Sequence, residues 1–208
     1  MGKLVSSRLA ALAALLLVFC SANLQAVEKD DPIRWEKEIQ AFEAADKTNP
    51  PPKNGVLFIG SSSIRLWKTL AADFPKRKVI NRGFGGSHLN DAVYYFDRIV
   101  TPYKPKTIVI YSGGNDINFG KTPEDVFGAF TNFVAKTRKS LPKTRVLYIA
   151  IAPNPARWAQ LEQIKAANTL IENFTKKIRS WHLSMCSPRC AAKTANPSPI
   201  FSRATICT

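Results

Sequence analysis

Three short polar segments of the sequence carry residue types that could supply a nucleophile and hydrogen-bond donors to a ligand. The first, Gly60-Ser61-Ser62-Ser63, places serine hydroxyls at the start of a predicted helix. The second, residues 81–88, is rich in glycine, so its backbone N–H groups can approach a ligand closely. The third, Ser112-Gly113-Gly114-Asn115-Asp116, offers an amide side chain. Each segment also has an ordinary reading as a helix cap, a tight connection or a turn, so the chemistry depends on the fold bringing them together.

Each polar segment directly follows a short apolar run. These runs, together with a fourth, cover residues 56–59, 79–80, 107–111 and 146–151 and alternate with helical stretches at 64–72, 89–100, 123–140 and 157–177. Continuous apolar runs indicate strands covered on both faces, hence a parallel sheet with helices on each side. In such sheets, active sites lie at the carboxyl ends of the strands. We therefore predict an α/β fold, a three-layer α/β/α sandwich with a parallel, flavodoxin-like sheet.

Taken together and in this order, the three segments resemble the SGNH hydrolases, also called the GDSL family of esterases and lipases. The resemblance is to exported bacterial lysophospholipase-like or acetylesterase-like members and runs from about residue 35 to residue 174. The family's Gly-Asp-Ser block reads Gly60-Ser61-Ser62 here, with serine at the position that is usually acidic. The glycine of the second block maps to Gly86, and the Gly-x-Asn-Asp of the third block maps to residues 113–116.

This resemblance implies a role for each matched residue. Ser62 is the expected nucleophile. The oxyanion hole is expected to consist of the backbone N–H groups of Ser62 and Gly86 and the side-chain amide of Asn115. Removing one prealigned donor of this kind costs about 3 to 4 kcal/mol of transition-state stabilisation. Three neighbours are assigned to substrate binding: Ser61, His88 and Asp116.

The family's catalytic base, a histidine in a carboxy-terminal Asp-x-x-His, is missing. The chain contains two histidines. His88 follows the oxyanion loop, where the family has no catalytic residue, and no aspartate follows Asp125 to orient His182. The cysteines near His182 match no standard zinc pattern, so we expect neither a metal nor a cofactor. The chain as written is expected to be a weak or inactive esterase.

Residues 178–208 differ in composition from the rest of the chain. No Asp or Glu follows Glu172, and three of the four cysteines lie in this tail. Our hypothesis for both features is a shift of reading frame near Lys176-Lys177, whose codons can form an adenine run. In the alternative frame, residues 180–190 can encode Val-Ala-Phe-Ile-Asp-Val-Phe-Thr-Pro-Met. Residues 204–208 can encode Asp-Asn-Leu followed by either His or Tyr, so Asp-Asn-Leu-His is recoverable there. We therefore predict a frameshifted, disordered tail, a lost fifth strand, and a fourth strand left at the sheet edge.

The amino-terminal residues predict export. Lys3 and Arg8 precede an apolar run at 9–19, and small or polar residues follow as far as Ala26, a pattern typical of a secretory signal peptide. The apolar run is shorter than the roughly 20 residues that span a membrane, so no integral span is expected after signal removal. Three regions are predicted: a signal peptide at 1–26, a truncated SGNH hydrolase-type esterase domain at 27–177, and the aberrant tail. The expected location is secreted or periplasmic.

The charge of the chain bears on whether it binds a nucleic acid. The net charge of +15 raises a nucleic acid as a possible partner. Much of the excess lies in the signal peptide and the tail, and no nucleic-acid recognition motif is present, so none is expected as a partner. The predicted function is an exported serine hydrolase acting on a small-molecule or lipid ester, either an acyl lipid or an acetylated sugar. The alternative is a non-catalytic binding protein that keeps the pocket of Ser62, Gly86 and Asn115.

Overall fold

The computed structural model of the chain describes residues 31–178 and 182–186. The chain divides into two compact units, residues 1–36 and residues 37–208. The described part of the first unit begins with a 3-10 helix, η1 (Pro32–Trp35), capped by the Asp31 carboxylate, which accepts the Ile33 N–H at 2.9 Å. The second unit contains the sheet. Within the described ranges, no helix is long and apolar enough to cross a membrane.

Helices and strands alternate along the second unit. In chain order the elements are α2 (Glu36–Thr48), β1 (Val56–Gly60), α3 (Ser62–Arg65), α4 (Leu70–Asp73), β2 (Val79–Gly83), α5 (Leu89–Tyr94), α6 (Phe96–Ile99), η2 (Thr101–Tyr103), β3 (Thr107–Tyr111), α7 (Gly114–Asn118), α8 (Pro123–Ser140), β4 (Arg145–Ile149), η3 (Pro155–Gln160), α9 (Leu161–Lys177) and β5 (Leu183–Cys186).

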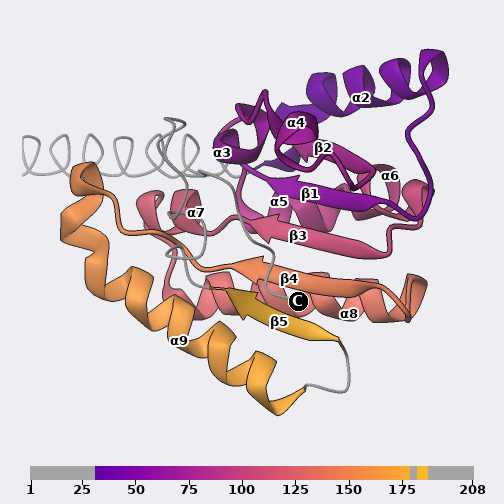
Figure 1. The fold of residues 1–208 in the computed structure, drawn as a ribbon. Coiled ribbons are helices and arrows are strands. Elements are labelled where there is room, and N and C mark those ends of the chain that lie inside the picture. The colour runs from indigo at the N-terminus through magenta and orange to yellow at the C-terminus, as the bar shows by residue number, and fades with distance from the viewer. Residues whose placement is uncertain (1–30, 179–181, 187–208) are drawn as a thin grey trace, which may run out of the picture. The chain divides into compact units, whose positions relative to one another are not determined.

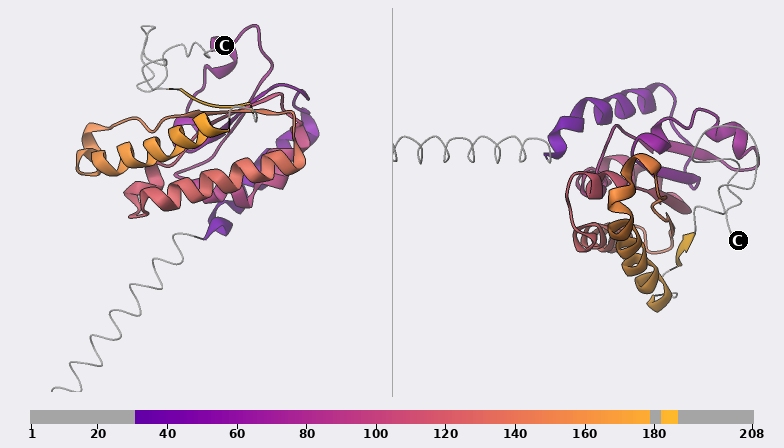
Figure 2. Two further views of the ribbon diagram at one scale, coloured as in Figure 1. Left: turned by 90° about the horizontal axis from the view of Figure 1, so that it is seen from below. Right: turned by 90° about the vertical axis from the view of Figure 1, so that its left-hand side faces the viewer.

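The strands form one parallel sheet in the order β2-β1-β3-β4-β5, with β1 inside it (Figure 1). Helices α8 and α9 lie side by side on one face, and α3 and α4 lie toward the other (Figure 2). The parallel sheet with helices on both sides confirms the predicted α/β sandwich. All the strands point the same way, so the segments that follow them meet at one edge of the sheet.

Side chains from both faces of the strands are buried, as the continuous apolar runs indicate. On one face, Phe58 of β1 packs against Trp67 and Phe74, with ring centroids 5.7 and 5.3 Å away. In β4, Tyr148 meets Phe130 of α8 edge to face, with ring centroids 5.0 Å apart. These aromatic contacts fix the helices on the sheet and hold the carboxyl ends of the strands in place.

The prediction that the sheet lacks a fifth strand is wrong. β5 pairs with β4 so that Leu183 lies opposite Val146 and Cys186 lies opposite Ile149, and Leu183 is buried. An exposed strand edge offers backbone groups that any extended segment can pair with, and Leu183 supplies an apolar side chain for the core. β4 is therefore not the edge strand. Residues 183–186 of the predicted disordered tail thus form a strand, while 179–181 and 187–208 lie outside the described residues.

An ion pair joins α2 to the sheet. Arg82 of β2 is paired with Asp46 of α2, and its Nε donates to the hydroxyl of Tyr103 at 2.7 Å. That hydroxyl donates in turn to Asp46 Oδ2 at 2.6 Å. The guanidinium also lies over the rings of Phe42 and Tyr103, 4.9 and 4.8 Å from their centroids. These three polar groups satisfy one another in a mostly buried position, which fixes α2 against β2.

This network predicts a loss of stability in alkali. Burial, together with the hydrogen bond to Asp46, raises the pKa of Tyr103 from 10.0 to about 12. A group whose pKa is raised by folding stabilises the fold below its unfolded pKa, and that contribution disappears as the pH rises through the folded pKa. The free energy of unfolding in urea should therefore fall between about pH 10 and pH 12. The fall should be smaller in Tyr103→Phe, and equal falls in the two proteins would contradict this account.

Candidate active site

Ser62 begins α3 immediately after the carboxyl end of β1. The strand ends at Gly60, where φ is +149° and a Cβ atom would lie 2.1 Å from the backbone oxygen of Tyr111, so only glycine fits the turn. Ser61 occupies the position before the helix, but its side chain makes no capping hydrogen bond. Ser61 therefore does not act as a conventional helix cap, and both Ser61 and Ser62 line the cavity described below.

The loop after β2 approaches the same edge of the sheet. The side chain of Asn81 braces it, donating to a backbone carbonyl of α3 at 2.7 Å and accepting the N–H of Gly83 at 2.9 Å. Further along the loop, a Cβ atom on Gly86 would have Asn115 Nδ2 as its nearest neighbour, at 3.9 Å. Neither the backbone N–H of Ser62 nor that of Gly86 has an acceptor among the described residues, but Gly86, unlike Ser62, does not line the cavity described below.

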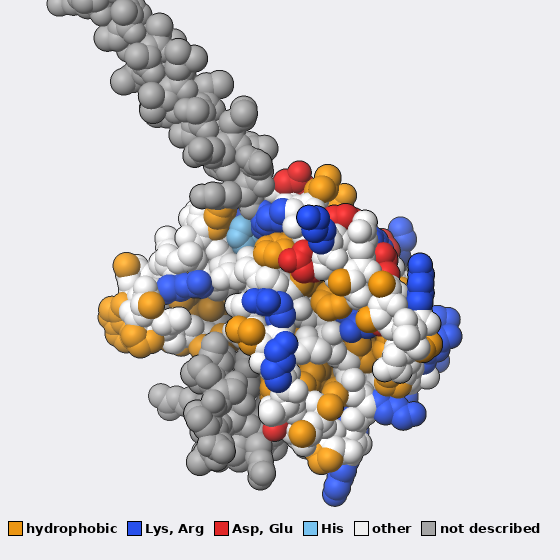
Figure 3. Space-filling model, turned by 90° about the horizontal axis from the view of Figure 1, so that it is seen from above, with side chains coloured by type: hydrophobic (Ala, Val, Ile, Leu, Met, Phe, Trp, Pro, Cys, Tyr) orange, Lys and Arg blue, Asp and Glu red, His pale blue; other side chains and the backbone are white. Residues whose placement is uncertain are grey.

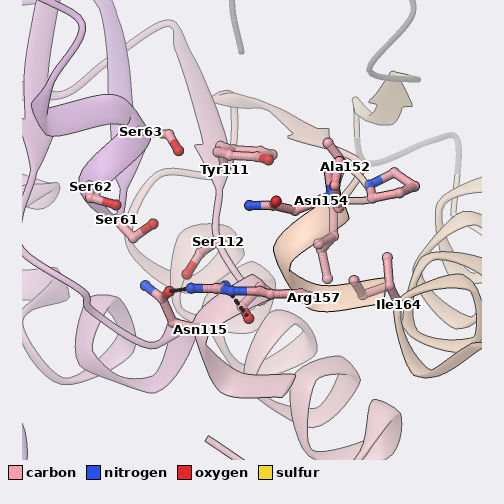
Figure 4. A pocket seen from close by; sticks show the side chains of 14 residues that line it. Ser61, Ser62, Ser63, Tyr111, Ser112, Asn115, Ala152, Asn154, Arg157 and Ile164 are labelled. Carbon is pink, nitrogen blue, oxygen red and sulfur yellow. Dashed lines mark hydrogen bonds between the residues drawn. The ribbon is translucent and has the colours of Figure 1, made fainter. Parts of the chain in front are cut away.

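Asn115 lies in the first turn of α7, after β3, and its amide is held on both sides. Its Nδ2 donates to the backbone oxygen of Ser87 at 3.2 Å. Its Oδ1 accepts Nη2 of Arg157 at 3.3 Å, while Nη1 of that arginine donates to the backbone oxygen of Gly114 at 2.9 Å (Figure 4). With the oxygen occupied by the guanidinium, the amide nitrogen is directed toward the glycine loop that contains Gly86.

A cavity of about 560 Å³ lies at the carboxyl end of the sheet. Its lining residues are Ser61, Ser62, Ser63, Tyr111, Ser112, Gly114, Asn115, Ile151, Ala152, Pro153, Asn154, Pro155, Arg157 and Ile164. Hydroxyl and amide groups gather on one side, while Ile164 lies on the other (Figure 4). A polar cluster beside an apolar wall suits a small ester, with its reacting carbonyl among the donors and a carbon chain against the wall.

Two of the residues assigned to substrate binding lie behind the cavity and do not line it. His88 and Asp116 are 5% and 1% exposed. The carboxylate of Asp116 accepts the backbone N–H of Leu89 at 3.1 and 3.2 Å, and burial raises its pKa, against the opposing charge of His88. The His88 ring packs on Phe119, with centroids 5.0 Å apart. These contacts brace α5 against α7. Ser61, the third residue of the set, does line the cavity.

His182 lies at the opposite end of the sheet from the cavity. Its backbone oxygen accepts the N–H of Val146 at 3.0 Å, at the amino end of β4. A strand rises about 3.3 Å per residue, so the length of β5 separates His182 from the carboxyl edge by roughly 13 Å. The exposed histidine lies instead beside a separate hollow of about 340 Å³, together with Arg145. Neither histidine of the chain lines the cavity that contains Ser62.

The sequence reasoning missed Arg157, Asn154 and the rest of the segment that follows β4. That segment was assigned in part to a helix at 157–177, whereas the structure has the 3-10 helix η3 before α9 begins at Leu161. Asn154 and Arg157 do not follow β4 directly, because Ala150 to Pro153 lie between, so the rule of polar residues directly after a strand did not find them. Within the described parts of the chain, no group of three or more His, Cys, Asp and Glu residues could hold a metal.

Comparisons with known proteins agree with this geometry. A GDSL-like lipase from Bacteroides thetaiotaomicron is 19% identical, with a TM-score of 0.61 over 81% of this chain and 82% of its own. AlinE4, an esterase of the SGNH-hydrolase family, is 14% identical, with a TM-score of 0.53 over 64% of this chain and 75% of its own.

At these identities the solved structures support the fold alone. No curated protein matches the sequence. The model of the GDSL-like Lipase/Acylhydrolase family matches residues 60–194, which is more than half of the sequence. The chain therefore belongs to the GDSL-like lipase and acylhydrolase family of hydrolases.

Proposed function

We propose that this chain is an exported serine ester hydrolase in which Ser62 is the nucleophile. One observation carries the proposal: Ser62 and Asn115 line a single cavity at the carboxyl end of the sheet, beside the loop that contains Gly86. Membership of a family of lipases and acylhydrolases supports an ester as substrate. The proposed site therefore consists of Ser62, Gly86 and Asn115, and the role of each can be tested.

In the proposed reaction, Ser62 Oγ attacks the carbonyl carbon of the ester. Negative charge develops on the carbonyl oxygen, which accepts hydrogen bonds from the N–H groups of Ser62 and Gly86 and from Asn115 Nδ2. Because Asn115 is held by hydrogen bonds on both sides, this donor needs little reorganisation as the charge forms. The alcohol then leaves with a proton, and water attacks the acyl-serine to release the acid and regenerate Ser62.

Among the residues that line the cavity, no histidine can accept the proton of Ser62. A serine hydroxyl is a poor nucleophile without an adjacent base, and neither histidine lines the cavity. We therefore propose that this form of the chain turns over esters slowly. The same observation favours a second candidate, a binding protein that keeps the cavity and the oxyanion donors but does not hydrolyse what it binds.

The proposed substrate is an acyl lipid or an acetylated sugar, and the proposed location is outside the cytoplasm, in the periplasm or the medium. The pattern of residues 1–26 supports export. We propose no nucleic acid as partner. On the face shown in Figure 3, Lys and Arg side chains are interspersed with acidic and apolar ones rather than gathered in one patch, which supports this view.

Adding a base from solution tests the proposal on the chain as it exists. Imidazole can occupy the cavity and accept the Ser62 proton, so it should raise the hydrolysis of 4-nitrophenyl acetate by the full chain above that of imidazole alone. Ser62→Ala should abolish this increase, whereas Ser140→Ala, at the distant end of α8, should not. An increase that persists in Ser62→Ala would contradict the serine mechanism. Binding of the ester without any rescue would favour the binding protein.

A further inference from the structure

We infer that the cavity binds an ester that also carries an anionic group, a carboxylate or a phosphate, and that Arg157 and Ser112 bind this anionic group. The inference rests on the proposed function, since it names the substrate class of the same cavity. It depends on two observations about residues outside the nucleophile and the oxyanion hole: an uncompensated positive charge and a buried hydroxyl without a partner.

Among the residues that the structure describes, Arg157 is the only charged one that lines the cavity. Its two hydrogen bonds go to neutral oxygens, the backbone oxygen of Gly114 and Oδ1 of Asn115. No described carboxylate pairs with it, and the sequence beyond Glu172 contains no Asp or Glu that could do so. A guanidinium has more N–H donors than these two bonds use, so donors and charge remain for a ligand.

The charge of Arg157 also acts on the residue at the far side of the polar cluster. Burial raises the pKa of the Tyr111 hydroxyl, and the positive charge of Arg157 opposes this rise. Both residues line the cavity. Arg157 thus places a positive charge on the cavity wall, and none of the described lining residues is an acid that would repel an anion.

Ser112 provides the second observation. It is 4% exposed, and its Oγ has no hydrogen-bond partner among the described residues. The residue lines the cavity, and its hydroxyl points toward Arg157 and Asn115 (Figure 4). Leaving a buried hydroxyl unpaired is costly, so a group that accepts its hydrogen bond binds favourably. A carboxylate or phosphate oxygen near Arg157 could accept from both side chains, and hydrogen bonds to a charged acceptor are stronger than neutral ones.

The orientation of Asn115 separates this anion site from the reacting carbonyl. Its nitrogen is directed toward the glycine loop, where the carbonyl oxygen of the ester is expected, and its oxygen faces Arg157. The carboxylate or phosphate of the substrate is therefore expected on the other side of Asn115, toward η3. It belongs to the acyl or alcohol part of the substrate and not to the ester group that Ser62 attacks.

A matched pair of esters tests the inference by binding, in the full chain with Ser62→Ala so that neither probe is hydrolysed. Monomethyl succinate carries a carboxylate, whereas methyl butyrate is a neutral ester of similar length. In calorimetric titrations, monomethyl succinate should bind at least about 10-fold more tightly, as expected for hydrogen bonds to a charged group. Monobutyl phosphate, compared with butanol, shows whether a phosphate is preferred to a carboxylate.

Adding Arg157→Met should remove the preference for the anion, because it should lower the affinity for monomethyl succinate much more than the affinity for methyl butyrate. Arg157→Lys, which keeps the charge, should retain part of the preference, and Arg145→Met at the other end of the sheet should retain all of it. If Arg157→Met does not fold, Ser112→Ala provides a second variant, which should lower the affinity for monomethyl succinate but not the affinity for methyl butyrate.

Equal affinities for the two esters, before any change to Arg157, would overturn the inference. The inference would also be overturned if Arg157→Met lowered the affinities for the two esters equally, because Arg157 would then act only by orienting Asn115. Failure of the serine mechanism has a different signature: hydrolysis that does not depend on Ser62, with the binding preference intact.

Discussion

Restoring the alternative reading frame after Lys177, and extending the chain past the recovered histidine, should convert a weak or inactive protein into an ester hydrolase. The present chain has the cavity, Ser62 and the proposed oxyanion donors, which by themselves would leave only a residual part of the catalysis of a serine hydrolase. A positioned general base contributes about 10² to 10⁴ in rate. Turnover of short-chain nitrophenyl esters should therefore rise by at least about 10²-fold.

Two controls isolate the base. Alanine in place of the recovered histidine should return the restored chain to the activity of the present one, and Ser62→Ala should abolish activity in both. Because β5 already pairs with β4, the restored strand should change the free energy of unfolding little. Full Ser62-dependent turnover by the 208-residue chain would show that it contains a base that the described cavity lacks.

Asn115→Ala should cause the second large loss of activity, measured in the restored chain. Its Nδ2 is the one side-chain donor of the proposed oxyanion hole, and removal of such a donor lowers kcat by about 10²- to 10³-fold. The interaction strengthens as charge develops on the carbonyl oxygen, so KM should change much less than kcat.

The matched control is Asn118→Ala, on the exposed surface of the same short helix α7. Its activity should equal that of the parent, and thermal unfolding of both variants should show that the fold is kept. If Asn115→Ala lowered kcat no more than Asn118→Ala, Asn115 would not belong to the oxyanion hole.

The central strands could be predicted because their side chains are apolar on both faces. The run at 107–111 coincides with β3. β2 was predicted to end at Ile80, but it continues to Gly83. Asn81 and Arg82 lie within the strand because their polar groups are satisfied locally, by the backbone beside α3 and by Asp46. No local pattern in the sequence identifies these partners.

Helix boundaries were less predictable than strands. The helix expected at 89–100 is two short helices, α5 and α6, separated at Tyr95, whose ring packs against Tyr94 and Phe84. The stretch expected to be one helix at 64–72 also divides, into α3 and α4 around the buried Trp67. In both cases aromatic packing in the core interrupts a helical spacing.

Much of the site was visible in the sequence because its residues follow strands directly. Ser62 and Asn115 do line one cavity, as the strand-end rule requires. His88 and Asp116 also follow strands, but their side chains turn into the core between α5 and α7, a direction that spacing alone does not give. β5 was missed because its pairing depends on the open edge of β4 rather than on its own composition.

The order of strands in the sheet bears on how the protein is made. After β1 and β2 have paired, each later strand joins the same growing side: β3 on β1, then β4 on β3, then β5 on β4. No strand has to be inserted between two that are already paired. Domains fold as their residues leave the ribosome, amino-terminal part first. The sheet can thus assemble stepwise in the order of synthesis. A change in the coding sequence after α9 alters only β5, the outermost described strand.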